Sequence, residues 1–179
     1  MRHLPKFTTL VAAAVALAPG LARAAEPPCL TAGEFTTLST YALPSLIDGA
    51  GLRCAASLPA DSFLRSGAGA LASRYAAIKP SVWPGAKAAF LKLSSGAGPE
   101  AADMLKSMPD QTVQQMVDGF VKGRLAQDIP VDRCATIDRL LHLLSPLPPE
   151  STAEIIGLAV GLGSRADHPH VGKISICKA

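Results

Sequence analysis

Hydrophobic residues recur at helical spacing along most of the chain and predict a series of short helices. Capping residues, prolines and glycines divide the chain into predicted helices that begin near positions 31, 61, 83, 99, 111, 132 and 150. The most regular stripe belongs to the helix that begins near 111, where five positions are expected to be buried: Val113, Met116, Val117, Phe120 and Val121. Asp118 and Lys122 lie on its polar face at a spacing of four, which predicts an ion pair between them.

The segment Glu150–Gly163 has a different pattern, because its second half is apolar nearly all round. It carries no charge from Ile155 onward, and its large side chains spread over most of the helical circumference: Ile155, Ile156, Leu158, Val160 and Leu162. A surface helix shows one apolar stripe, so we expect this segment to be the central helix, covered on several sides. Gly157 and Gly161 would let a neighbouring helix approach closely. The alternative interpretation of this apolar surface is self-association or the lining of a ligand site.

The first predicted helix has a complete start signal. Thr31 can serve as the N-cap and Glu34, three residues later, can close a capping box. Pro44 lacks an amide hydrogen and predicts a kink or a restart of the helix near Leu43. We expect the helix to end at the glycines at positions 49 and 51.

Three other stretches lack a regular helical pattern or stand at helix boundaries. Trp83 lies near a helix start between two prolines, where it is either a packed corner or a residue that stacks on a ligand. The stretch 94–98 predicts a loop within one domain, since each half of the chain alone would hold a small core. Ile174–Cys177 alternates like a strand without an evident partner, which predicts an extended tail held by its cysteine.

The four cysteines are Cys29, Cys54, Cys134 and Cys177. In an exported domain an even number of cysteines predicts disulfides, and four cysteines allow three pairings. We expect Cys29–Cys54 and Cys134–Cys177, because each bridge then closes a loop within one half of the chain. A zinc site is the alternative, but no two cysteines have the close spacing of such sites.

Residues 1–24 have the organisation of a signal peptide. Arg2 and Lys6 precede an apolar run, and Ala22-Arg-Ala24 matches a small-x-small cleavage site. Cleavage near Ala24 predicts a periplasmic or secreted bacterial protein in which residues 25–179 form a single helical domain without a membrane span. The loss of three basic residues reduces Lys and Arg from 17 to 14, equal to the 14 acidic residues, so the mature charge is about zero and nucleic acid is not an expected partner.

Motifs for catalysis or cofactor binding are absent from the sequence. It contains no His-Glu-x-x-His, no Gly-x-Ser-x-Gly, no Walker loop and no EF-hand loop, and we expect no cofactor. The strongest polar group is Asp167, His168 and His170, which is a weak candidate for zinc or copper, with a solvated loop as the alternative. His142 could pair with Asp138 at a spacing of four, with a boundary position on its helix as the alternative to a general base. Because the cysteines are expected to form disulfides, no pair of nucleophile and base can be nominated.

These patterns predict an all-α fold, a single compact bundle of about six or seven short helices stapled by disulfides, with an extended C-terminal tail. We expect a non-enzymatic binding or protein-interaction role, with an unknown protein or an apolar small molecule as the partner. The candidate binding residues are Ile155, Leu158, Leu162 and Trp83. The alternatives are a small enzyme whose site is assembled from distant residues, or a metal-binding protein that uses the 167–170 loop.

Overall fold

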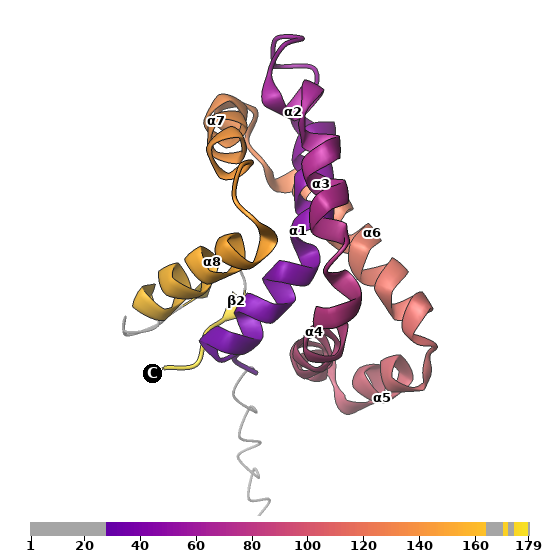
Figure 1. The fold of residues 1–179 in the computed structure, drawn as a ribbon. Helices are drawn as coiled ribbons and strands as arrows, with labels where there is room; N and C mark the ends of the chain where they lie inside the picture. Colours follow the sequence, from indigo (N-terminus) through magenta and orange to yellow (C-terminus); the bar gives the residue numbers. More distant parts are fainter. Residues whose placement is uncertain (1–27, 164–169, 172–173, 179) are drawn as a thin grey trace, which may run out of the picture.

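The computed structural model describes residues 28–163, 170–171 and 174–178, and it confirms the all-α prediction (Figure 1). The described part contains eight α-helices: α1 Ala32–Cys54, α2 Phe63–Ser66, α3 Ala68–Ala76, α4 Lys79–Ser94, α5 Pro99–Ser107, α6 Asp110–Asp128, α7 Cys134–Leu144 and α8 Pro149–Gly163. Short 3-10 helices cover Ser95–Ala97 and Val131–Arg133. Eight helices stand where six or seven were predicted, partly because Gly67 separates α2 from α3.

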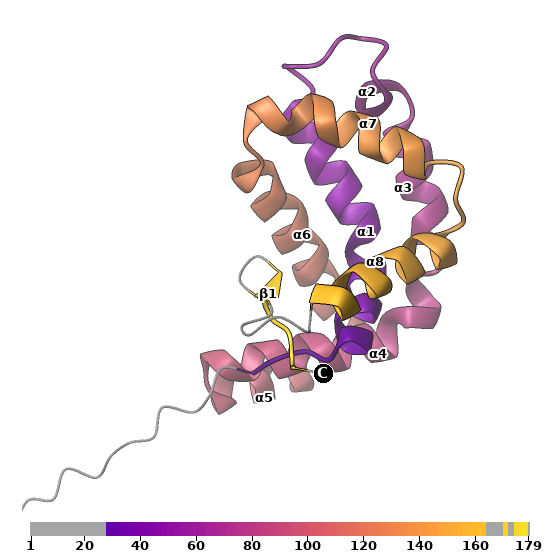
Figure 2. The same cartoon turned by 90° about the vertical axis from the view of Figure 1, so that its left-hand side faces the viewer.

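Helix α1 is the centre of the fold. It contacts α3, α4, α6 and α8, which surround it in both views (Figures 1 and 2). Small buried residues on α1, among them Ala42, Gly49 and Ala50, allow other helices to approach from several directions. The prediction that α8 is the central helix, covered on several sides, is therefore wrong. Its apolar side chains Leu158 and Leu162 are 63% and 67% exposed.

The predicted capping box at the start of α1 is confirmed. The Glu34 amide donates to the Thr31 hydroxyl over 3.2 Å, and the Thr31 amide donates to the Glu34 carboxylate over 2.8 Å. Lys92 on α4 donates to the same carboxylate over 2.8 Å. The Lys92 hydrogen bond, followed by that of the Thr31 backbone, lowers the pKa of Glu34 from 4.5. This cap therefore also joins α1 to α4.

We expect Glu34→Gln to reduce the loss of stability in acid. Because the pKa of Glu34 is lower in the folded than in the unfolded protein, its contribution is present above pH 4.5 and is lost as the pH falls through the folded pKa. The group is about a third exposed, so the effect is less than about 1 kcal/mol. Glutamine keeps the capping hydrogen bond. Urea unfolding between pH 7 and pH 3 measures the difference, with the exposed Glu154→Gln as control; an unchanged acid profile for Glu34→Gln contradicts it.

Helix α1 continues past the two places where the sequence predicted its interruption. Pro44 lies inside the helix, which is one element from Ala32 to Cys54, so the predicted restart near Leu43 is wrong. The glycines at 49 and 51 also lie within it. Gly49 is buried, and burial of α1 against its neighbours stabilises the helix more than these residues weaken it.

Both predicted disulfide pairings are wrong, although all four cysteines are bonded. The bridges are Cys29–Cys177 and Cys54–Cys134. A helix of 23 residues is about 35 Å long, and bridged cysteines have Cα atoms less than about 7 Å apart. Cys29 and Cys54 stand at opposite ends of such a helix, so no bridge can join them.

The two ends of the described chain meet beside α1. Leu30 donates its amide to Ser175 over 2.9 Å and accepts the Cys177 amide over 2.8 Å, next to the Cys29–Cys177 bridge. The tail also forms a small antiparallel pair between β1 (His170–Val171) and β2 (Ile174–Ser175). The extended tail held by Cys177 is thus confirmed. The tail pairs with Leu30 and, through β2, with β1, and the sequence identified neither partner.

Helix α6 is confirmed as a helix, but its surface differs from the prediction. Val113 and Val117 are buried, whereas Met116 and Phe120 are exposed. The predicted pair of Asp118 with Lys122 is not formed: Asp118 accepts from Lys79 on α4 over 2.5 Å and from Ser45 on α1 over 2.9 Å. The Asp118 carboxylate therefore joins α6 to α4 and to α1.

The Asp118 carboxylate belongs to a partly buried cluster at the junction of α1, α4 and α6. The Lys79 ammonium lies 4.3 Å from the centre of the Tyr41 ring, which packs on Trp83 at 5.0 Å. Burial, followed by the nearby Asp118 charge, raises the pKa of the Tyr41 phenol well above its usual range. Tyr41 is therefore neutral at physiological pH and serves as a packing residue.

Candidate functional site

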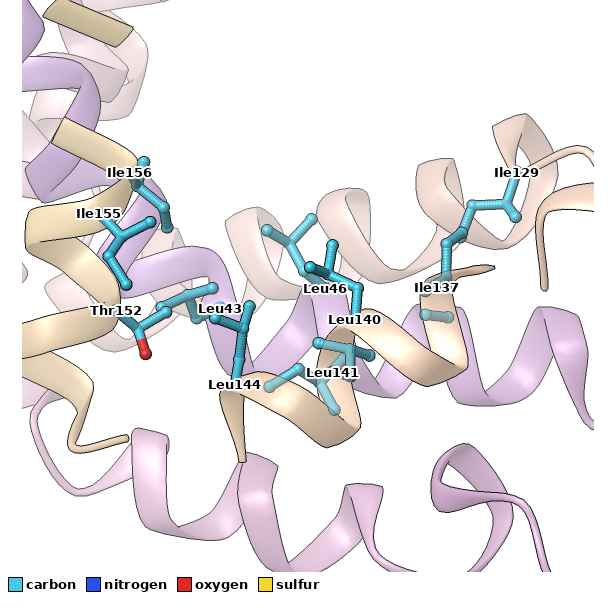
Figure 3. A pocket seen from close by; sticks show the side chains of 12 residues that line it. Leu43, Leu46, Ile129, Ile137, Leu140, Leu141, Leu144, Thr152, Ile155 and Ile156 are labelled. Carbon is cyan, nitrogen blue, oxygen red and sulfur yellow. The ribbon is translucent and has the colours of Figure 1, made fainter. Parts of the chain in front are cut away.

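An open apolar groove lies between α1, α7 and α8 (Figure 3). Its volume is about 380 Å³, toward the lower end of the range of small-molecule sites. Eleven of its twelve lining residues are hydrophobic: Leu43, Leu46, Ile47 and Ala50 from α1, Ile129, Ile137, Leu140, Leu141 and Leu144 around α7, and Ile155 and Ile156 from α8. The twelfth is Thr152. The groove thus presents a nearly continuous carbon surface.

Helical periodicity places these side chains on one side of each helix. On α7 the lining residues follow the spacing i, i+3, i+4 and i+7, and on α1 they follow i, i+3, i+4 and i+7 as well. The Cys54–Cys134 bridge joins the end of α1 to the start of α7 and holds α7 against α1. Both sulfur-bearing residues are buried, with exposures of 0% and 1%. The bridge is therefore a structural support of the α7 wall.

The single polar side chain of the groove has partners outside it. The Thr152 hydroxyl lies 2.7 Å from the Tyr75 hydroxyl of α3 and 3.5 Å from the Pro148 carbonyl. Both Tyr75 and Thr152 are buried. This pair fixes the start of α8 to α3. The groove consequently offers an occupant apolar contact and almost no hydrogen bonding.

Exposed leucine and isoleucine side chains stand along both edges of the groove. Leu140 on α7 is 54% exposed and Ile155 on α8 is 46% exposed. Leu143 is also exposed on α7, as are Leu158 and Leu162 on α8, although these three do not line the groove itself. Large exposed apolar side chains on the two helices that line one groove are typical of an interaction surface.

The four predicted binding residues do not lie together in the structure. Ile155 lines the groove, and Leu158 and Leu162 lie exposed further along the same helix. Trp83 lies apart from the groove on α4, where it is 6% exposed and packs against Tyr41. The structure thus places Trp83 in a packed corner, the interpretation that its sequence position favoured over ligand stacking.

The polar candidates do not form a catalytic cleft among the described residues. Asp138 accepts a hydrogen bond from the Leu64 amide over 2.6 Å and holds α2 against α7. The His142 ring stacks on Phe63 at 5.3 Å. Within the described side chains no group of three potential ligands could hold a metal ion. Asp167 and His168 lie outside the described residues, and His170 is described only as part of β1.

The groove residues on α1 and α7 were missed as binding candidates by sequence reasoning. Their apolar spacing predicted buried helix faces, and a face that lines an open groove has the same spacing. Leu140 gives the clearest example, because it shares an apolar helical face with Ile137, Leu141 and Leu144 and yet is half exposed. The groove becomes apparent only when the fold brings these faces of α1 and α7 together with α8.

Comparison of the chain with protein-family models, with curated proteins and with solved structures gives no match in any of the three. No helix in the described segments has both the length and the apolar character needed to cross a membrane.

Proposed function

We propose that this is a non-enzymatic binding protein whose groove receives the apolar face of an α-helix from a partner protein. The observation that carries the proposal is the carbon surface of the groove, whose one polar side chain is already paired. A buried polar group without a hydrogen bond is costly, so the occupant has to satisfy its own polar groups. An α-helix does so along its backbone and presents side chains at intervals of three and four.

The openness of the site favours a helix over a small apolar molecule. Small-molecule sites enclose their ligands and contain a few polar groups that fix the orientation of the ligand. Here Leu140 and Ile155 line the groove from α7 and α8 and stay half exposed to solvent, and Thr152 is the one polar side chain of the lining. A partner helix, about 10 Å in diameter, offers a broader apolar face than a small ligand for covering these two exposed side chains.

Two disulfides support a location outside the reducing cytosol, because such bridges persist in oxidising compartments. Together with the signal-peptide pattern of residues 1–24, they support a periplasmic or secreted protein. We therefore expect the partner helix to belong to another exported protein.

Leu140→Glu is expected to weaken the binding of an amphipathic helical peptide by at least roughly tenfold, because it places a charge on the edge of the groove. The probe is a designed peptide with leucines at i, i+3, i+4 and i+7 and a fluorophore that responds to burial. Leu52→Glu on α1 is the matched control, since Leu52 is 64% exposed and does not line the groove. Equal binding by both variants contradicts the proposal. Tight binding of a fatty acid without binding of the peptide supports the small-molecule alternative.

A further inference from the structure

Helix α8 has two apolar faces, and only one is covered. The covered face packs on α1: Thr152 and Val160 are buried, and a Cβ atom at Gly157 would lie 3.0 Å from the Thr36 hydroxyl oxygen. The other face consists of Ile155, Leu158, Ala159 and Leu162, all exposed and spaced i, i+3, i+4 and i+7. We call these four residues the α8 ridge. A helix that is apolar on all sides is expected to be covered on all sides.

We infer that the occupant of the groove is the α8 ridge of a second copy of this chain, in a two-fold symmetric dimer. This inference rests on the proposed function, since it names the partner helix of the same groove. The ridge has the spacing and the carbon surface that the groove requires, and Ile155 belongs to both. Ridge and groove are thus adjacent on one helix. Each ridge can lie between the α7 and α8 of the other copy, and the two equivalent contacts close around one axis.

The exposed apolar area is sufficient for a dimer and large for a monomer. Leu140, Leu143, Ile155, Leu158 and Leu162 together expose on the order of 500 Å² of carbon surface, near the upper end of what one patch on a monomer reaches. Two copies would bury about 1,000 Å² through these side chains alone, and the residues around them add to the total. A specific interface begins at roughly that size.

The charges beside the two surfaces are complementary. The charged residues of α8 are Glu150 and Glu154, both exposed, whereas α7 presents the exposed Arg139 beyond Leu140 and Leu143. Within the described residues none of these three side chains makes an ion pair. Carboxylates on the outer side of one ridge can therefore face the arginine of the other copy. The same carboxylates disfavour an anionic membrane surface, which attracts helices rich in lysine and arginine.

Sedimentation velocity of the purified, disulfide-bonded protein tests the inference. The wild type is expected to be a dimer at micromolar concentration, and Leu158→Glu is expected to raise the dimer dissociation constant on the order of 100-fold. Leu52→Glu, equally exposed and away from the ridge, is expected to remain dimeric. Circular dichroism checks that each variant is folded. A wild type that stays monomeric, or a Leu158→Glu variant that stays dimeric, overturns the inference.

A mixing experiment tests whether the ridge enters the groove and does not simply pack on another ridge. Leu140→Glu damages the groove and leaves the ridge intact, whereas Leu158→Glu damages the ridge and leaves the groove lining intact. Each variant alone is expected to be monomeric, and a mixture of the two is expected to form heterodimers through its one intact contact. A Leu140→Glu variant that dimerises like the wild type contradicts ridge-in-groove docking.

Two further measurements distinguish the dimer hypothesis from the proposed helix-binding function and from binding to a membrane surface. Monomeric Leu158→Glu retains the groove, so binding of the designed helical peptide to it supports helix binding even if the wild type does not dimerise. Cosedimentation with anionic phospholipid vesicles by a monomeric wild type, lost in Leu158→Glu, would assign the ridge to a lipid surface and overturn the dimer.

Discussion

The double variant Cys54→Ala/Cys134→Ala is expected to lose about 4 kcal/mol of unfolding free energy together with the binding of the helical peptide. The bridge spans 80 residues, and a cross-link over a loop of that size restricts the unfolded chain by about this amount. It also holds the buried start of α7 against the end of α1. Without it, α7 is positioned chiefly by its contacts with α2 and α1, and one wall of the groove is less firmly held. Urea unfolding and peptide fluorescence measure the two losses.

The variant Cys29→Ala/Cys177→Ala is the control that separates stability from site geometry. Its bridge spans 148 residues, so we expect a loss of stability of comparable size, on the order of 4 to 5 kcal/mol. This bridge lies where Leu30 pairs with the tail, away from the residues that line the groove. Peptide binding should therefore persist at temperatures at which the variant is folded. If both double variants lose binding equally while folded, the role assigned to Cys54–Cys134 is wrong.

Ile47→Ala is expected to lower the free energy of unfolding by about 3 kcal/mol and to change the shape of the groove. Ile47 is 1% exposed, belongs to the core cluster between α1, α3 and α7, and also lines the groove. Truncating a fully buried isoleucine costs its transfer free energy and leaves a cavity, which together reach 2 to 5 kcal/mol. The lost side-chain atoms deepen the groove beneath any helix that lies in it.

Leu46→Ala is the matched comparison for this effect. Leu46 lines the same groove from the same helix but is partly exposed, so its truncation leaves a smaller cavity and should cost roughly 1 kcal/mol. Both variants should bind the helical peptide more weakly than the wild type. Thermal unfolding and peptide titration distinguish them, and equal stability losses would show that Ile47 is less buried than the structure indicates.

The local features of the chain were largely predictable from sequence. The capping box at Thr31 and Glu34 and the α6 helix depend on residues within a few positions of one another. Interactions of this range are encoded by spacing, because a helix repeats every 3.6 residues. The disulfide partners were not predictable in the same way, since helix α1 carries Cys54 about 35 Å away from Cys29.

The candidate site was predicted only in part. The sequence identified the apolar character of α8 and named Ile155, which lines the groove. It did not identify the groove residues of α1 and α7, because an apolar stripe has the same spacing whether a neighbouring helix covers it or not. The ion pair of Asp118 was mispredicted for a similar reason. Lys79, from another helix, pairs with Asp118 in place of Lys122, its neighbour on the same helix.

The sequence by itself determined the helical class of this protein, the start of its first helix and the uncharged, apolar surface of α8. Only the tertiary structure decided that α1 is the central helix, that the chain ends are joined through Cys29 and Cys177, and that one face of α8 stays uncovered. The physical reason is that periodicity fixes which side of a helix is apolar, whereas the number and direction of its neighbours depend on contacts between residues far apart in the chain. The apolar groove of this protein results from such long-range contacts.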